Sequence, residues 1–339
     1  MKKNGLKIAA VIIAAISALA LSSCSSGTAS PVATPAGSAP AGSPAAKTGL
    51  KLAATFPVLD QYLQKVADAM QKEAAATGNT INIQSAQGNT TDGDASLQLS
   101  QVKAFIAQGV DGVMIIPVDS STTGAMDSVL QQAGTQFVYV NRMPKDLASG
   151  VSYVGSDEKL GATTMAQYLV KQMENKGNVA IMEGDPASQA ALDRTSAATA
   201  VFQQAGIKIL DTQNGMFMAN NAFPIAQNWI TAYHACTPSS TLTAISSNND
   251  DMATGIVSAL KKAGCKPGDV LVSGSDATAQ GQDLIKQGWL VGSMFQDATG
   301  QGAGGVDALI NQISGGAAKN VDVPYELVTT DNVASFAGK

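Results

Sequence analysis

The segment ISSNNDDMATG (245–255) places two amides and two carboxylates in a row, directly after an apolar run. Asn248, Asn249, Asp250 and Asp251 are residue types that bind metals, transfer protons or hydrogen-bond an uncharged ligand. The two acids are adjacent and diverge at a helix start, whereas a calcium loop needs ligands at alternating positions around a glycine turn. We therefore expect no metal site. We expect Asn248 to end the strand, Asn249 to contact a ligand, Asp250 to cap the helix and Asp251 to face solvent.

Polar residues also stand at the ends of other predicted strands, where the chain turns into a helix. The pairs are Val118-Asp119, Asn141-Arg142, Ser156-Asp157 and Ser275-Asp276. In open α/β sheets the carboxyl ends of the strands form the ligand-binding edge. An Asp or Asn there also serves as a helix N-cap, which we expect for Asp157. Arg142 and Arg194 cannot act as N-caps, and they favour a binding site at this edge.

Composition and motifs argue against catalysis and nucleic-acid binding. The 339 residues include one histidine, His234, and no Gly-x-Ser-x-Gly elbow, Walker-type loop or dinucleotide fingerprint. Asp60 and Asp276 could flank a glycosidic bond, but Arg142 and Arg194 would keep both acids ionised. The chain has 21 basic and 26 acidic residues, which give a net charge of −5, and its basic residues form no cluster that would indicate nucleic-acid binding. We expect no enzyme activity, no cofactor and no nucleic-acid partner.

A neutral polyol fits the polar residues better than a metal or a scissile bond does. Each hydroxyl donates one hydrogen bond and accepts two, so a matching site mixes carboxylates, guanidinium groups and amides. A buried polar group that is left unpaired is costly, so such a site selects against analogues that lack one of the hydroxyls. The residues that would supply its polar part are Asp60, Asn141, Arg142, Arg194, Asn249, Asp276 and Gln296. The apolar face of a sugar also favours an aromatic platform.

Short apolar runs alternate with helical periodicity from Leu50 onward. The predicted strands are residues 50–55, 81–86, 112–118, 137–141, 151–155, 178–184, 207–213, 242–247, 270–275 and 291–295. Strands alternating with helices predict an α/β fold with parallel sheets and right-handed crossovers. About ten strands in roughly 290 residues fit two sheets better than one.

The N-terminus predicts an extracytoplasmic, lipid-anchored protein. Three lysines precede a short apolar stretch (8–21) and the sequence LSSC (21–24). This pattern is typical of a secretion signal, here residues 1–23, and resembles the bacterial lipobox, whose Cys becomes the lipid-modified first residue. A cleaved signal that merely contains Cys24 is the alternative. Residues 24–48 are rich in Ser, Gly, Ala, Pro and Thr, which predicts a flexible linker.

Two further cysteines, Cys236 and Cys265, stand at predicted helix ends just before strands. Both should lie at the same edge of a sheet in an oxidising compartment, where they can form a disulfide. Two buried free thiols are the alternative.

Six segments, in this order, resemble the type I periplasmic sugar-binding proteins of ABC importers, especially the galactose/glucose- and ribose-binding proteins. They are FVYVNRMP (137–144), YVGSDEKLGATTMAQYL (153–169), EGDPASQAALDRT (183–195), SSNNDDMATGIVSALKKAG (246–264), SGSDATAQGQDLIKQG (273–288) and VPYELVTTDNV (323–333). The resemblance implies two similar lobes, each a parallel β-sheet flanked by helices, joined by a three-segment hinge. The N-terminal lobe would contain residues 49–156 and 297–325, and the C-terminal lobe residues 157–296 and 326–339.

The resemblance also implies which residues bind the ligand. They are Asp60, Tyr62, Asn141, Arg142, Arg194, Asn249, Asp276 and Gln296. Tyr62 replaces a stacking phenylalanine, although its position beside Leu63 and Val66 on one helix face also fits a core role. Arg142 is similar to an arginine of the ribose type, and Gln296 matches a hinge amide.

Some positions depart from the galactose/glucose type. Ser188 and Ala190 stand where that type has His and Asp, and its calcium loop is missing. Asn221 falls at the second stacking position, which Phe217 or Phe223 could fill instead. These departures leave the individual sugar open.

The resemblance implies a monomer that captures a hexose, pentose or related polyol between two closing lobes. It would deliver this ligand to an ABC permease with a separate ATPase subunit. A receptor that presents sugar to a chemoreceptor or histidine kinase is the alternative. A sugar-responsive transcription regulator is disfavoured by the lipobox and by the missing helix-turn-helix.

Overall fold

The computed structural model describes residues 47–88 and 93–339. These described residues belong to one compact unit with its own hydrophobic cores. The predicted signal peptide, Cys24 and residues 24–46 of the linker lie outside the described residues. Within the described ranges, no helix combines the length and the apolar character needed to cross a membrane.

The first sheet has six strands in the order β11-β5-β4-β3-β1-β2, all parallel. They are β1 (Lys51–Phe56), β2 (Thr80–Ser85), β3 (Gly112–Ile115), β4 (Gln136–Val140), β5 (Ser152–Gly155) and β11 (Val321–Asp322). Consecutive residues such as Val113 and Met114 are both buried, because helices cover both faces of the sheet. This burial explains why the sequence has continuous apolar runs here instead of strict alternation.

The second sheet has six strands in the order β12-β10-β9-β8-β6-β7. They are β6 (Asn178–Glu183), β7 (Lys208–Asn214), β8 (Ala244–Ser247), β9 (Leu271–Asp276), β10 (Gly292–Phe295) and β12 (Glu326–Val328). β12 is antiparallel to β10, and the other neighbouring pairs are parallel. The two predicted parallel sheets are thus confirmed, with one antiparallel edge strand.

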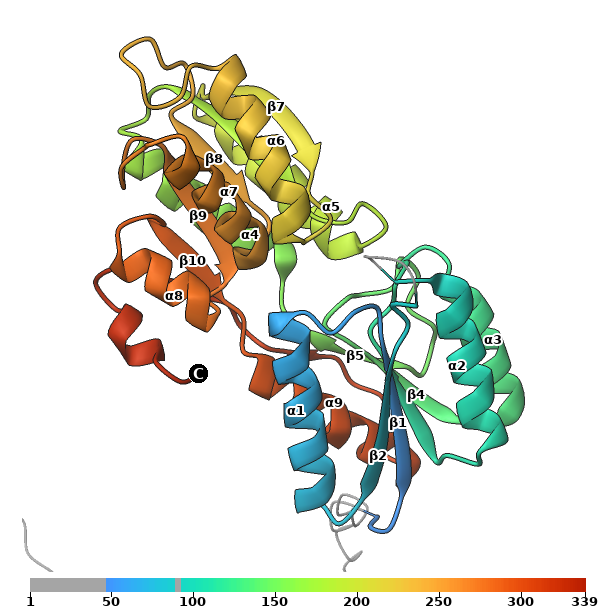
Figure 1. Ribbon diagram of the computed structural model, residues 1–339. Coiled ribbons are helices and arrows are strands. Elements are labelled where there is room, and N and C mark those ends of the chain that lie inside the picture. Colours follow the sequence, from blue (N-terminus) through green and yellow to red (C-terminus); the bar gives the residue numbers. More distant parts are fainter. Residues whose placement is uncertain (1–46, 89–92) are drawn as a thin grey trace, which may run out of the picture. The chain divides into compact units, whose positions relative to one another are not determined.

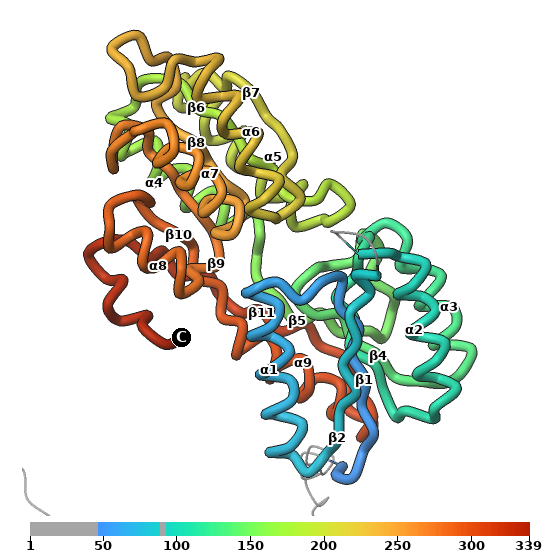
Figure 2. Tube along the Cα trace, in the orientation of Figure 1, coloured from blue at the N-terminus to red at the C-terminus, as the bar shows by residue number. Residues whose placement is uncertain are grey.

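Helices cover both faces of the first sheet (Figure 1). α1 (Gln61–Ala76) and α9 (Ala298–Ile313) pack on one face, and α2 (Ala95–Ala107) and α3 (Gly124–Ala133) on the other. The tube in Figure 2 shows that α9, from late in the chain, returns to lie beside α1. A side chain at Gly302 would place its Cβ 2.5 Å from the Val66 carbonyl oxygen, so this close helix contact requires glycine.

The second sheet is covered in the same way. α6 (Ala219–Ala232), α7 (Asp250–Lys262) and α8 (Ala279–Lys286) share a core on one face with the 3₁₀ turn η1 (Val333–Phe336). α4 (Glu158–Gln172) and α5 (Gln189–Gln204) pack on the opposite face. Each sheet therefore has its own pair of apolar layers.

The chain passes between the two sheets three times. The crossings follow β5 (residues 156–157), β10 (296–297) and β11 (323–325). All three are short, and each begins where a strand ends at its carboxyl edge. They are the only covalent links between the sheets in the part of the chain that the structure describes.

All ten predicted strands are present, with small shifts at their ends. β3 ends at Ile115, three residues before the predicted boundary, and Pro117 has no N–H to continue the ladder. β11 and β12 were not predicted as strands because they have only two and three residues.

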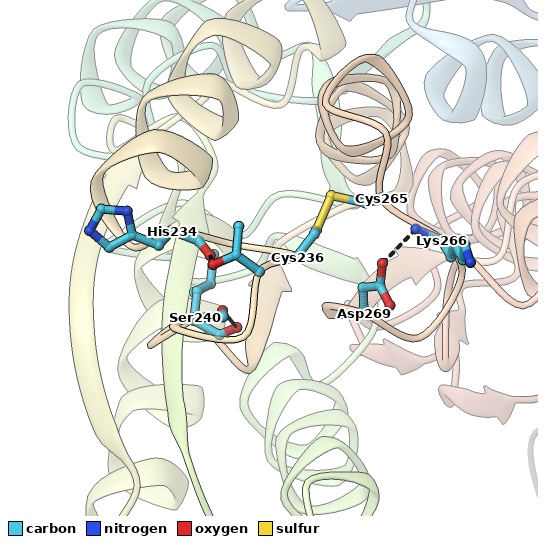
Figure 3. Close-up of a disulfide and its surroundings, with 8 residues drawn as sticks. His234, Cys236, Ser240, Cys265, Lys266 and Asp269 are labelled. Atoms are coloured by element: carbon cyan, nitrogen blue, oxygen red, sulfur yellow. Dashed lines mark hydrogen bonds between the residues drawn. A yellow bond between two sulfur atoms is a disulfide. The ribbon is translucent and has the colours of Figure 1, made fainter.

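Cys236 and Cys265 form a disulfide, with their Cα atoms 5.5 Å apart. Figure 3 shows that it joins the loop after α6 to the loop after α7. Both cysteines follow helix ends, as the sequence predicted.

We expect the Cys236→Ser, Cys265→Ser double variant to unfold more easily than the wild type. The disulfide closes a loop whose ends are 29 residues apart, and cross-links of this length stabilise by about 3 kcal/mol. Urea denaturation followed by circular dichroism would measure the change. An unfolding midpoint equal to that of the oxidised wild type would contradict the prediction, and reduced wild type serves as the control.

Candidate ligand-binding site

One cavity collects all eight predicted ligand-binding residues from the carboxyl edges of both sheets. It has a volume of about 30 Å³. Its lining residues are Asp60, Tyr62, Leu63, Asn141, Arg142, Ala190, Arg194, Phe217, Asn249, Asp276 and Gln296. The structure brings these side chains together around one cavity. Their contact with a ligand stays a prediction.

Asp60 has two roles, because it caps α1 as well as lining the cavity. Its Oδ1 accepts a hydrogen bond from the Leu63 N–H at 2.7 Å. Burial raises the pKa of Asp60, while the Leu63 N–H and Arg142 oppose the rise. Asp157 caps α4 in the same manner, as predicted, by accepting from the Leu160 N–H.

The Asn-Asn-Asp-Asp segment is divided differently from our expectation. Asn249, and not Asp250, is the N-cap of α7, with its Oδ1 accepting from the Met252 N–H at 2.9 Å. Asp251 does not simply face solvent, because it accepts from the Ala219 N–H at the start of α6. The N-cap lies one residue earlier than expected because α7 begins at Asp250, close after the buried end of β8.

Asp250 is fully buried and joins three elements of the second lobe. Its carboxylate accepts hydrogen bonds from the Thr278 N–H at 2.8 Å and from the Ser293 hydroxyl at 2.7 Å. Burial raises the pKa of Asp250 to about 7, although these hydrogen bonds oppose the rise. It joins the start of α7 to the N-cap of α8 and to β10, without lining the cavity.

Arg194 reaches the cavity from α5 but is held by a buried network. Its Nε lies 2.6 Å from Glu158 Oε2, its Nη1 donates to the Asn248 carbonyl oxygen at 2.7 Å, and its Nη2 donates to the Tyr325 hydroxyl at 2.9 Å. The Tyr325 hydroxyl in turn donates to Glu158 Oε2 at 2.7 Å. Neither Glu158 nor Tyr325 was predicted to take part in the site.

This network ties the three crossings together. Glu158 begins α4 after the first crossing, Gln296 lies in the second, and Tyr325 lies in the third. Gln296 Nε2 donates to Glu158 Oε1 at 3.4 Å. Burial disfavours the charge of Arg194, yet Glu158 and Tyr325 raise its pKa well above the usual range. Arg194 is therefore a cation under all ordinary conditions.

Asp276 ends β9 and turns its carboxylate toward the cavity. Its Oδ1 lies 3.9 Å from Arg194 Nη1. Burial raises the pKa of Asp276 well above its usual range, and Arg194 opposes the rise. The nearby acids Asp250 and Asp60 raise this pKa further.

Phe217 provides an aromatic face beside Arg142. The guanidinium carbon of Arg142 lies 5.4 Å from the Phe217 ring centroid, and that of Arg194 lies 6.0 Å from it. Of the three candidates for the second stacking position, Phe217 lines the cavity, whereas Asn221 and Phe223 do not; its stacking on a ligand stays a prediction.

Tyr62 is a core residue and a cavity residue at once. It packs with the α1 and α9 core and is 7% exposed. Its hydroxyl is buried and has no hydrogen-bond partner among the described residues.

Ala190 lines the cavity, whereas Ser188 is fully buried before α5.

Three cavity residues have left-handed backbone conformations. The φ angles are 63° at Asn141, 59° at Phe217 and 104° at Asp276. Such conformations cost about 1 to 3 kcal/mol each in residues other than glycine, and they persist where the surroundings fix them. The backbone therefore places these side chains at some expense of stability.

A larger cavity of about 300 Å³ lies beside the first crossing. Three of its four carboxylates have partners within the protein: Asp157 caps α4, Glu158 pairs with Arg194, and Asp193 pairs with Lys159. The smaller cavity is the better candidate, because donors and acceptors converge there.

The sequence and the structure are similar to those of known solute-binding proteins. The sequence model of the family described as "Periplasmic binding protein domain" matches residues 55–317. A protein of Rhizobium meliloti, provisionally assigned as rhizopine-binding, is 35% identical over 253 residues, which cover 73% of this chain and 80% of that protein.

Two further proteins extend the comparison. The D-ribose/D-allose-binding protein of Pseudomonas aeruginosa is 29% identical over 273 residues, covering 78% of this chain and 82% of that protein. An ABC transporter solute-binding protein from Bacillus halodurans, solved with bound myo-inositol, is 29% identical with a TM-score of 0.78. That similarity covers 85% of this chain and 97% of the solved chain.

We expect Glu158→Gln to lower the free energy of unfolding by about 3 to 5 kcal/mol, because it removes the carboxylate that lies nearest to the buried Arg194. Lys159→Ala is the matched control. Lys159 is 66% exposed and pairs with Asp193, so its loss should cost less than about 1 kcal/mol. Equal denaturation midpoints for the two variants would refute a structural role for the buried pair.

Proposed function

The chain belongs to the periplasmic binding protein family, and on that premise we propose that it is the extracytoplasmic solute-binding protein of an ABC importer. Its ligand would be a monosaccharide or a related polyol. Such a protein binds and releases its ligand without an enzymatic step.

One observation carries this proposal: a single cavity presents acceptors, donors and groups that do both. Asp60 and Asp276 accept, Arg142 donates, and Asn141 can do either. A hydroxyl needs this mixture, because it donates one hydrogen bond and accepts two. Phe217 adds an apolar face, as a sugar ring favours.

Capture would require the walls of the cavity to move. A volume of about 30 Å³ has room for roughly two water molecules, which is less than a monosaccharide needs. We take the moving lobes to be residues 49–156 with 297–325 and residues 157–296 with 326–339, connected by the three crossings. A ligand that contacts both lobes would favour the closed arrangement by its differential affinity.

The ligands named for the related proteins support the polyol class and leave the individual compound open. They include ribose, allose, rhizopine and myo-inositol. Ala190 lines the cavity where the galactose/glucose type has an acid, which disfavours those two hexoses.

A panel of pentoses, hexoses and cyclitols should contain at least one compound that raises the Tm of the 43–339 fragment. At 100 times its Kd a ligand stabilises by about 2.7 kcal/mol, or roughly 5 °C. Asp276→Gly should abolish the shift without lowering the Tm of the free protein, because glycine adopts a φ of 104° readily.

The control is Asp283→Ala on the exposed side of α8, which should keep the full shift. A complete panel without any shift would refute the proposed ligand class. Retention of the shift in Asp276→Gly would remove Asp276 from the site.

We also propose that Cys24 carries a lipid and that residues 24–48 tether the protein to the bacterial membrane. The support is the LSSC sequence after a short apolar segment. Wild-type protein should fractionate with membranes, and its N-terminal peptide should show the added lipid mass by mass spectrometry. Cys24→Ser should lose that mass. An unmodified Cys24 peptide from the mature wild type would refute the anchor.

A further inference from the structure

The cavity contains an excess of negative charge. Asp60 and Asp276 line it together with Arg142 and Arg194. The charge of Arg194 is already matched by Glu158, 2.6 Å from its Nε. Among the described residues that line the cavity, the two carboxylates therefore share it with one guanidinium that is not paired with Glu158, that of Arg142.

The position of Arg194 limits what it can do for Asp276. Its Nη1 is 3.9 Å from Asp276 Oδ1, beyond hydrogen-bond distance, and donates instead to the Asn248 carbonyl oxygen at 2.7 Å. Burial raises the pKa values of both Asp60 and Asp276, and the negative charge of Asp60 adds to the effect at Asp276. Arg142 opposes the rise at Asp60 and Arg194 opposes it at Asp276, so the two acids are compensated only in part.

The Tyr62 hydroxyl is the second, independent indication of a ligand that carries a hydrogen-bond donor. It lines the same cavity and is buried without a hydrogen-bond partner among the described residues. A buried hydroxyl without a partner is costly. Its oxygen can accept a hydrogen bond from a ligand donor.

We propose that the ligand is a polyol bearing an ammonium group, an amino sugar or an aminocyclitol, whose nitrogen binds among Asp60, Asp276 and Tyr62. An ammonium has three donors and no acceptor, which matches two carboxylates and one phenol oxygen. A hydroxyl at the same position has a single donor and leaves the negative charge in place. This inference rests on the proposed function and narrows its ligand class.

Matched ligand pairs test the charge directly. Isothermal titration of the 43–339 fragment at pH 7 would compare scyllo-inositol with scyllo-inosamine, glucose with glucosamine, and galactose with galactosamine. In at least one pair the amine should bind at least tenfold more tightly, which corresponds to about 1.4 kcal/mol.

Variants locate the ammonium. Asp60→Asn should reduce the amine preference to less than threefold, and because asparagine is an equally good N-cap the start of α1 should stay intact. Tyr62→Phe removes only an unpartnered hydroxyl and should weaken the amine severalfold. Asp68→Asn, on the exposed face of α1, is the matched control and should keep the full preference.

The outcomes separate this inference from the function on which it rests. If the neutral member of every pair binds as tightly as the amine, the ammonium is refuted and polyol binding stands. If neither member of any pair binds, and the wider panel also fails, both proposals are wrong. An amine preference that survives Asp60→Asn and Asp276→Asn alike would also overturn the assignment.

Discussion

The buried ion pair of Arg194 and Glu158 is the interaction on which both the hinge and the site depend. Removing two charges from water costs free energy. The ion pair offsets this cost because the hydrogen-bonding groups of both side chains have partners. Tyr325 bonds to both members, and Gln296 bonds to the carboxylate. The pair thus connects all three crossings at the place where the cavity begins. Any movement of the lobes must keep this network or reorganise it.

The same side chains hold the fold and line the cavity. Asp60 and Asn249 each cap a helix that begins after a strand, and both line the cavity. Capping needs a side-chain oxygen at the carboxyl edge of the sheet, which is also where a ligand meets the strand ends. At these positions a helix-capping role therefore coincides with a place in the wall of the cavity. Residues with two such roles are therefore assigned incorrectly when each is given a single role from its sequence position.

Much of the fold could be predicted from the sequence, because strand and helix periodicity is a local signal. The ten predicted strands, and the eight candidate ligand-binding residues among those that line the cavity, follow from it and from the family resemblance. The ion pair was missed because Glu158 stands 36 residues before Arg194 and reads as an ordinary acid in the first turn of a helix. Tyr325 was missed for the same reason. The role of Asp250 depends on which residue caps α7, and periodicity does not fix boundaries to one residue.

Backbone strain shows which parts of the site are rigid. Asn141, Phe217 and Asp276 have left-handed φ angles, and such conformations persist only when packing fixes them. Asn141 is fixed by bonds from its Nδ2 to Gln301 and from the Tyr153 hydroxyl to its carbonyl oxygen. The backbone that carries these three side chains is therefore fixed by its surroundings. Under the proposed function, specificity would depend on fixed donors, acceptors and charges, while the adjustment needed for ligand entry would belong to the three crossings.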